Sequence, residues 1–381
     1  MISYPLYLWH WVIISFLYIY LGRKPETIIL ILAIFLSLIF AHLTKKYIEK
    51  LRYQKNVTPY LVSILFIVGL LGFYTEHKKG LPDRSNMKNF IEANNQFKRT
   101  PAEDEICTNY VESILGKDKS FHYCRASKDI RKKNKKLVAI IGDSHAHVLF
   151  HGISKAARKN GYETVLFANS SCPTLKEFKW GKSKKEVNAC QKKIEEILML
   201  IQKDKRIEKV IMTTRGPVYI HGEVEGVFTE KSVNTSLSII RNKKKSLITP
   251  NYANFSNGFN NTIQKLKDLP HIKNIYYILE NPELDFLPKE VIPRPFDFFD
   301  ISINRDTVNR TLYLKRMSKY RESISNFRFS KLSVLDPLNA LCDDTKCFSK
   351  IKGKFLYADN DHFSKFGSIY IANYFQNEIF D

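Results

Sequence analysis

Three apolar stretches near the start of the chain constrain its fold more than any other feature. They cover residues 4–21, 28–41 and 60–74, and none contains Asp, Glu, Lys or Arg. With its flanks, each is long enough to cross the hydrocarbon core of a bilayer as a helix of about 20 residues. Beyond about residue 75 no apolar run reaches that length. The sequence therefore predicts three transmembrane helices, with the lipid bilayer as a partner, followed by a water-soluble domain.

Basic residues beside these stretches predict their orientation. Only Arg23 and Lys24 lie between the first and the second, whereas residues 45–55 are rich in Lys and Arg. Basic loops stay in the cytoplasm, so the third helix should run outward. We expect a multi-pass protein of the inner (cytoplasmic) membrane, with its soluble domain in the periplasm or extracytoplasmic space and its first helix as the insertion signal.

The net charge of +22 is spread along the chain as short lysine clusters. No nucleic-acid recognition motif accompanies them, so we expect no nucleic-acid partner. A basic surface of this kind suits contact with anionic lipid or polysaccharide.

All six cysteines lie beyond the apolar stretches, in the part predicted to be exported. An even number of cysteines in an exported domain indicates disulfides. Several connectivities are open, and sequential pairing is favoured because it closes three short loops: Cys107 with Cys124, Cys172 with Cys190, and Cys342 with Cys347. Zinc is the rival interpretation, but no Cys-x-x-Cys pair is present, so we expect no metal.

From residue 137 onward, short β-branched or aromatic runs alternate with longer helical patterns. The expected strands are residues 137–141, 164–168, 209–213, 274–279 and 332–335. The expected helices are residues 145–159, 184–202, 260–267, 306–327 and 364–377. This alternation predicts right-handed crossovers and a flavodoxin-like, three-layer α/β/α fold with a mostly parallel sheet. We expect a transmembrane segment over residues 1–78, a linker and N-terminal extension over 79–135, and the α/β domain over 136–381.

The turn Gly142-Asp143-Ser144-His145 directly follows the first expected strand. Ligand sites in parallel α/β sheets lie beyond the carboxyl ends of the strands, where Ser144 falls. Gly142 permits a sharp bend, and the amides at a helix N-terminus would stabilise an oxyanion near Ser144. An ordinary helix cap after a buried strand would have the same sequence.

A second polar motif, Asp359-Asn360-Asp361-His362, precedes the last expected helix. A carboxylate three residues before a histidine can hold Nδ1–H and leave Nε2 to take a proton from a serine. Asp361 could compete with Asp359, but it is adjacent to His362 and would have to curl back. A surface turn with a solvated histidine is the alternative. Because both motifs fall in one α/β domain, we favour a triad of Ser144, Asp359 and His362.

The two motifs resemble the first and last blocks of the SGNH hydrolase family. Residues 3–11, Ser-Tyr-Pro-Leu-Tyr-Leu-Trp-His-Trp, resemble a signature in a late transmembrane helix of the acyltransferase-3 family, the membrane O-acyltransferases of bacterial envelopes. Residues 47–52 resemble the basic ending of that family's membrane domain. The order of these features resembles the acyltransferase-3 proteins that carry an extracytoplasmic SGNH domain.

The resemblance implies transfer of an acyl group, commonly acetyl, to a hydroxyl of an envelope polysaccharide such as lipopolysaccharide O-antigen. Ser144 would be the nucleophile, Asp359 the orienting acid and His362 the general base. No cofactor is expected on the chain itself. An acyl donor, for which an acetyl-CoA-derived group is the candidate, would be supplied through a membrane domain. An extracytoplasmic carbohydrate esterase or deacetylase is the alternative enzyme, and a non-catalytic remnant that binds or anchors glycan is the alternative outside enzymes.

Two departures from these families stand out. The Gly-x-Asn-Asp block of SGNH hydrolases is not visible, and its expected place offers Arg215 and Gly216; Gly142 and Asn169 are further candidates to bind an oxyanion or substrate. The early helices of acyltransferase-3 proteins, which handle the acyl donor, do not precede the signature. We therefore expect either a truncated or split product, or a partnership with a separate membrane acyltransferase subunit.

The disulfide interpretation predicts no free thiol in the oxidised protein. A thiol-labelling reagent applied under denaturing, non-reducing conditions should modify none of the six cysteines. Labelling of several of them would contradict the interpretation.

Overall fold

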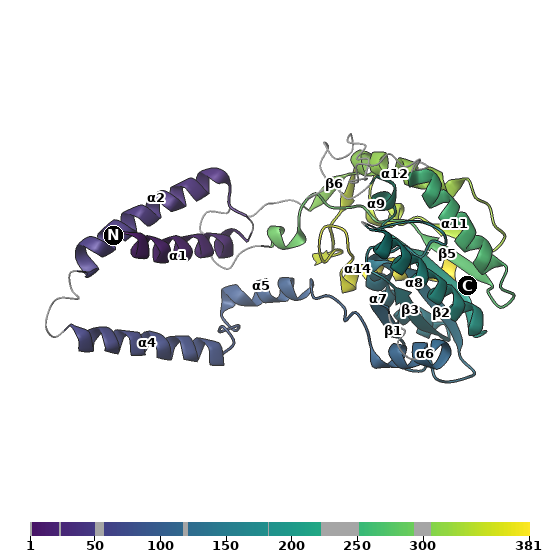
Figure 1. Ribbon diagram of the computed structural model, residues 1–381, viewed down its shortest axis with the longest axis horizontal. Helices are drawn as coiled ribbons and strands as arrows, with labels where there is room; N and C mark the ends of the chain where they lie inside the picture. The colour runs from purple at the N-terminus through teal and green to yellow at the C-terminus, as the bar shows by residue number, and fades with distance from the viewer. Residues whose placement is uncertain are drawn as a thin grey trace. The chain divides into compact units, whose positions relative to one another are not determined.

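A computed structural model describes residues 2–22, 24–49, 57–116, 121–181, 183–221, 251–292 and 306–381, and the structural statements below concern these residues. The chain divides into two compact units, one of Met1–Asn95 with Lys289–Arg305 and the other of Gln96–Pro288 with Asp306–Asp381. Figure 1 shows the elements of both.

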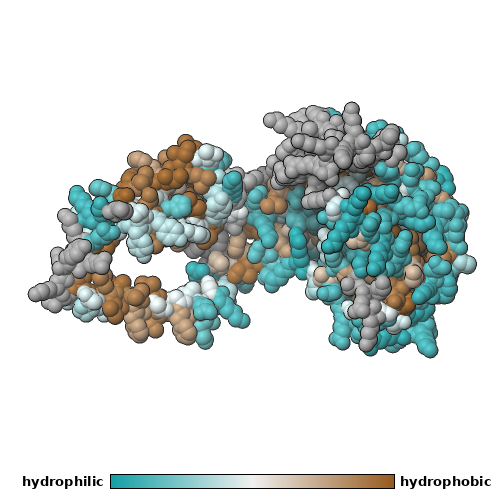
Figure 2. All heavy atoms as spheres, in the orientation of Figure 1, coloured by the Kyte–Doolittle hydropathy of each residue, from teal (hydrophilic) through white to brown (hydrophobic). Residues whose placement is uncertain are grey.

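The first unit contains the three predicted apolar helices. They are α1 (Ser3–Leu21), α2 (Thr27–Leu43), which continues through the π-helical turn η1 (Thr44–Ile48), and α4 (Thr58–His77). All three are long and apolar enough to cross a membrane. Many of their large apolar side chains are exposed, and Figure 2 shows hydrophobic surface mainly over α2 and α4. A shorter polar helix, α5 (Ser85–Asn95), follows.

The second unit is built on a six-stranded sheet in the order β1-β3-β2-β4-β5-β7. Five strands confirm the prediction: β2 (Lys136–Gly142), β3 (Tyr162–Ala168), β4 (Ile207–Thr213), β5 (Asn274–Ile278) and β7 (Leu332–Leu335). These five run parallel. The sequence did not indicate β1 (Tyr123–Ala126), which comes from the expected extension and pairs antiparallel with β3 at one edge.

Helices cover the sheet where crossovers are expected, with three differences in their bounds. The main helices are α6 (Glu105–Leu115), α7 (Ser144–Lys159), α8 (Lys184–Lys203), α11 (Asn251–Lys267), α12 (Arg310–Ser325), α14 (Lys365–Tyr374) and α15 (Gln376–Phe380). The helix expected over 260–267 is the end of the longer α11. The one expected over 364–377 is divided between α14 and α15.

The helix expected to start at residue 306 starts later, because residues 307–309 form a short strand. This strand, β6 (Thr307–Asn309), pairs with β8 (Lys346–Phe348), and Asn309 then caps α12. Four smaller elements complete the unit: α9 (Gly216–His221), α13 (Leu338–Leu341) and the paired strands β9 (Lys350–Ile351) and β10 (Lys354–Phe355). The 3-10 turn η2 covers Pro288–Val291.

The strand order places helices on both faces of the sheet. The chain moves from β2 to β3 through α7 and then returns past β2 to β4 through α8. Right-handed crossovers therefore put α7 and α8 on opposite faces. Residues 137–141 of β2 are fully buried, as expected for a central parallel strand covered on both faces.

The direction of the connections reverses at β2, so the crevice between the carboxyl ends of β2 and β4 is the expected ligand site. Ser144 lies two residues beyond the end of β2, and Arg215 lies two residues beyond the end of β4. The fold thus brings both of these residues to one edge of the sheet.

All six cysteines form disulfides, in the sequential pairing that the sequence favours. Cys107–Cys124 joins α6 to the edge strand β1, and Cys172–Cys190 joins the loop after β3 to α8. Cys342–Cys347 closes the loop after α13. The first two tie peripheral elements to the sheet.

Close packing of α7 on α14 depends on Gly152. Its amide donates a hydrogen bond of 2.9 Å to Ser368 Oγ, and a Cβ added at Gly152 would overlap the Ser368 carbonyl oxygen. Replacing Gly by Ala in a helix ordinarily stabilises by roughly 0.5–1 kcal/mol. Here overpacking should outweigh that gain, at about 1–3 kcal/mol.

We therefore expect Gly152→Ala to lower the urea midpoint of the second unit. Trp180 is the single tryptophan beyond residue 95, so its fluorescence reports on this unit. Lys155→Ala, on the exposed face of the same helix, is the control and should change stability by less than about 0.5 kcal/mol. A midpoint for Gly152→Ala at or above that of the unaltered protein would contradict the packing argument.

Candidate active site

Ser144 is held at the start of α7 by the residue before it. One oxygen of the buried Asp143 carboxylate accepts a hydrogen bond from the His145 amide (2.9 Å) and so caps the helix. The other accepts from the Arg215 amide (2.9 Å) and from Tyr219 Oη (2.7 Å). Burial and the neighbouring Asp143 raise the pKa of Tyr219, so it stays a donor. Asp143 thus ties the Ser144 turn to the end of β4.

Gly142 has a structural role at this turn. Its φ is +151°, and a Cβ at this position would overlap the carbonyl oxygen of Thr213 on the neighbouring strand. Only glycine lets β2 approach β4 this closely where the chain turns into α7.

The structure brings the three predicted triad residues together. His362 Nε2 lies 2.8 Å from Ser144 Oγ, and His362 Nδ1 lies 3.1 Å from each carboxylate oxygen of Asp359. Nδ1–H can therefore donate to Asp359 while Nε2 accepts from the serine, which is the arrangement needed to remove a proton from Ser144.

A second carboxylate lies against the same imidazole. Asp361 Oδ1 is 2.9 Å from His362 Nδ1. The sequence suggested that Asp361 would have to curl back to reach this nitrogen, and the conformation of the loop places it there. Asp359 Oδ1 accepts hydrogen bonds from the amides of both Asp361 (3.1 Å) and His362 (2.8 Å), and the loop folds around that carboxylate.

The two carboxylates determine the protonation of His362. Burial acts to lower the pKa of His362, but the hydrogen bond to Asp359 and the charge of Asp361 outweigh it and raise the pKa to about 10. Burial alone would raise the pKa of Asp361, yet His145 and His362 hold it well below its usual range. The two carboxylates therefore favour the protonated form of His362.

Further charged residues, most of them buried, lie beside this loop. Arg215 Nε is 2.8 Å from Asp361 Oδ2 and 2.9 Å from Glu283 Oε1, and Arg316 Nε is 2.6 Å from Glu283 Oε2. Burial acts to lower the pKa of Arg215, but Glu283 and Asp361 raise it above its usual range. Each of these buried charges has an opposite charge beside it, as burial requires.

A buried histidine and glutamate complete this group. His145 Nδ1 lies 3.2 Å from Glu280 Oε1, and His145 Nε2 lies 3.7 Å from Asp361 Oδ2. Burial raises the pKa of Glu280 well above its usual range, and the neighbouring Glu283 adds to the effect. The predicted site residues do not include Glu280 or Glu283, although two glutamates just beyond the carboxyl end of a buried strand indicate a position near the site.

Arg215, Gly216 and Asn169 are further candidates from the sequence for binding an oxyanion or substrate. The Arg215 side chain binds carboxylates, its amide donates to Asp143, and the Gly216 amide donates to the Thr214 carbonyl oxygen. Asn169 directly follows β3, whose last residue pairs with Gly142. Its side-chain Oδ1 accepts a hydrogen bond from the His122 amide (3.2 Å), so its side-chain Nδ2 is the group that could donate to an oxyanion. Asn169 therefore stays a candidate for binding an oxyanion.

We assign no metal to the described residues. His145, Asp361 and His362 come close together, but both ring nitrogens of His362 already contact Asp359 and Ser144. The group is therefore interpreted as part of the triad, and the expectation of no metal stays a prediction.

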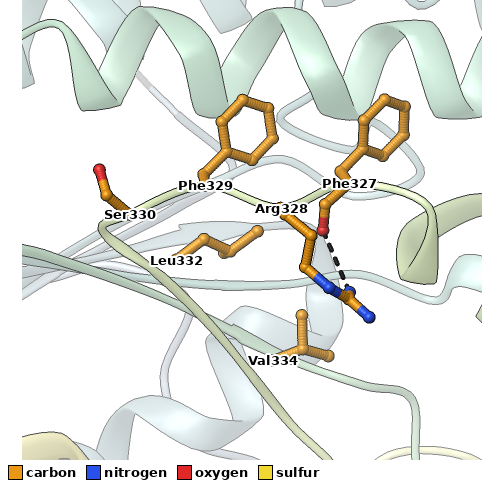
Figure 3. A pocket seen from close by; sticks show the side chains of 6 residues that line it. All are labelled: Phe327, Arg328, Phe329, Ser330, Leu332 and Val334. Atoms are coloured by element: carbon orange, nitrogen blue, oxygen red, sulfur yellow. Dashed lines mark hydrogen bonds between the residues drawn. The ribbon is translucent and has the colours of Figure 1, made fainter.

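The hollow drawn in Figure 3 lies elsewhere. It is lined by residues beside and within the edge strand β7, namely Phe327, Arg328, Phe329, Ser330, Leu332 and Val334. None of the triad or its buried partners contributes to it, so it is not the candidate site.

Comparison with known proteins agrees with this architecture. Residues 107–377 match the family model described as SGNH domain (fused to AT3 domains). The chain is similar in fold to the periplasmic domain of a lipopolysaccharide acetyltransferase from Salmonella ser. Paratyphi A, with a TM-score of 0.50 and 17% identity over 78% of this chain and 98% of that one. No curated protein matches the chain.

The environment of His362 predicts its titration. Its imidazolium should persist as the pH rises above the ordinary histidine value of 6.5 and be lost only near pH 10. Long-range ¹H–¹⁵N spectra of histidine-labelled protein would measure this, with the signal assigned by its loss in His362→Gln. His151 is an internal control, because burial lowers its pKa below 6.5. Titration of His362 near 6.5 would contradict the two-carboxylate environment.

Proposed function

Because the chain belongs to the family of SGNH domains fused to AT3 domains, we propose that it is an O-acyltransferase of the cell envelope. It would transfer an acyl group, with acetyl as the expected one, to a hydroxyl of a polysaccharide such as lipopolysaccharide O-antigen. During the transfer the acyl group would be held on Ser144 as an ester.

The geometry of Ser144, His362 and Asp359 carries this proposal. The 2.8 Å contact between His362 Nε2 and Ser144 Oγ is short enough for direct proton transfer. Asp359 holds the opposite ring nitrogen, which supports the tautomer that leaves Nε2 free to accept. Ser144 also begins a helix of 16 residues, whose positive N-terminal end favours an anion at this position.

In the first half-reaction, neutral His362 would take the proton of Ser144 as Oγ attacks the carbonyl carbon of the acyl donor. The negative charge that develops on the carbonyl oxygen would be stabilised by the Ser144 amide and by Asn169 Nδ2. His362 would then give this proton to the departing leaving group, so the acyl group would remain on Ser144 and His362 would again be neutral.

In the second half-reaction, a hydroxyl of the glycan would lose its proton to His362 and attack the acyl-serine. The new ester would form on the sugar, and the proton would return to Ser144 Oγ. Water in place of the glycan would make the same site an esterase, so the acceptor decides between the two activities.

The apolar helices of the first unit support a location in the membrane. The similar structure is named as the periplasmic domain of a lipopolysaccharide acetyltransferase, and we extend a periplasmic location and an envelope glycan acceptor to this chain as part of the proposal. The acyl donor would then reach Ser144 through a membrane domain, supplied either in the same polypeptide or by a separate subunit.

The proposal predicts an acetyl-serine intermediate. The full chain in detergent, given an activated acetyl ester, should gain one acetyl group on the peptide that contains Ser144, detected by mass spectrometry. Ser144→Ala should lower turnover by more than about 1,000-fold, because the nucleophile is lost. With an envelope polysaccharide added, the acetyl group should appear on the glycan.

Ser170→Ala is the matched control, because Ser170 is an exposed serine in the loop after β3. The activity of this variant should equal that of the unaltered protein. Unchanged turnover in Ser144→Ala would contradict a serine mechanism. Hydrolysis without transfer to any envelope glycan would favour the esterase instead.

A further inference from the structure

We propose that Asp361 is a second positioning carboxylate of this active site, which orients His362 together with Asp359 and is itself held by Arg215. This inference rests on the proposed acyl transfer at Ser144. It differs from a triad with one orienting acid, because the imidazole would keep a carboxylate partner after either aspartate is neutralised.

The contacts of His362 Nδ1 support two partners. Asp361 Oδ1 lies 2.9 Å away, and the two oxygens of Asp359 lie 3.1 Å away. The hydrogen bonds go to Asp359, whereas Asp361 is within ion-pair distance. A small rotation of the ring would move the N–H from one carboxylate to the other while Nε2 stays beside Ser144.

The surroundings of the two carboxylates differ. Asp359 is 19% exposed, and its other partner, Arg99, is 75% exposed and lies 2.8 Å from Oδ2. Asp361 is only 5% exposed, and Arg215 is 29% exposed. Water and salt screen the Asp359–Arg99 pair, so the charge of Asp361 should act on His362 with less screening.

Arg215 keeps Asp361 charged and in place. Its guanidinium contacts Asp361 Oδ2, which leaves Oδ1 toward His362. The backbone of Asp361 is fixed as well, because its carbonyl oxygen accepts from Asn281 Nδ2 (2.8 Å) in the segment after β5. Asp361 is therefore held from β4 and from β5, and not only by its own loop.

The groups that face His362 and Asp361 come from several elements. The cations are Arg99 from the start of the unit, Arg215 after β4 and Arg316 on α12, with Arg316 acting through Glu283. The other titratable groups include His145 and His147 on α7, Asp143 before that helix, and Glu280 and Glu283 after β5. Neutralising Asp361 removes the buried anion nearest to Nδ1, so the imidazolium should lose its proton more readily.

The test uses the full chain with Asp359→Asn, Asp361→Asn and the double variant, and it measures both the His362 titration and the pH dependence of acyl transfer. His362 is the base only when neutral, so activity should rise as the pH rises toward the pKa of His362. Asp361→Asn should lower that pKa and move the acidic limb of the profile to lower pH by about one unit or more.

Asp359→Asn should keep a pKa for His362 above 6.5, because Asp361 remains, and should retain at least about 10-fold more activity than the double variant. Asp344→Asn, a fully exposed loop aspartate, is the control and should leave both readouts unchanged. Asp359 lies near the surface, so this variant tests the idea even if Asp361→Asn fails to fold.

Two results would overturn the inference. In the first, Asp361→Asn changes neither the acidic limb of the pH profile of acyl transfer nor the pKa of His362. The other is an Asp359→Asn variant in which His362 titrates at 6.5 and activity equals that of the double variant. If the unaltered protein transfers no acyl group at all, the proposed function fails, while the titration still decides the role of Asp361.

Discussion

The close approach of β2 to β4 at their carboxyl ends is the constraint on which the rest of the site depends. β2 is buried on both faces, and Gly142 removes the side chain that would otherwise push the two strands apart. The Asp143 carboxylate can then reach across to the Arg215 amide while it caps α7. Ser144 is thereby held, half-buried, at a helix N-terminus.

Charge compensation below the turn links elements that are distant in the sequence. Arg215 after β4, Glu283 after β5, Arg316 on α12 and Asp361 before α14 form a chain of ion pairs. Glu283, Arg316 and Asp361 are buried and Arg215 is half-buried. Removing one member would leave an opposite charge without a partner in a poorly solvated place, which costs several kcal/mol. The same pairs align the ends of the strands that carry the site. Stability and the orientation of His362 therefore depend on one set of interactions.

Local sequence patterns predicted much of this protein. The five parallel strands, the three apolar helices, the sequential disulfides and the association of Ser144 with His362 and Asp359 all appear in the structure. The edge strand β1 was missed because its four residues show no clear alternation and are bound mainly by pairing with β3 and by a disulfide. The start of α12 was misplaced because β8, far along the chain, draws residues 307–309 into a strand.

The sequence by itself determined which residues are apolar enough to enter a membrane or a core, and where a serine turn and an aspartate–histidine loop occur. These properties depend on residues a few positions apart, so a linear pattern contains them. Only the tertiary structure decided that Asp361 shares His362 with Asp359 and that Glu280 and Glu283 lie beneath the site. Those contacts join residues from four separate segments of the chain. Their distances depend on the order and register of the strands, which a linear sequence pattern does not contain.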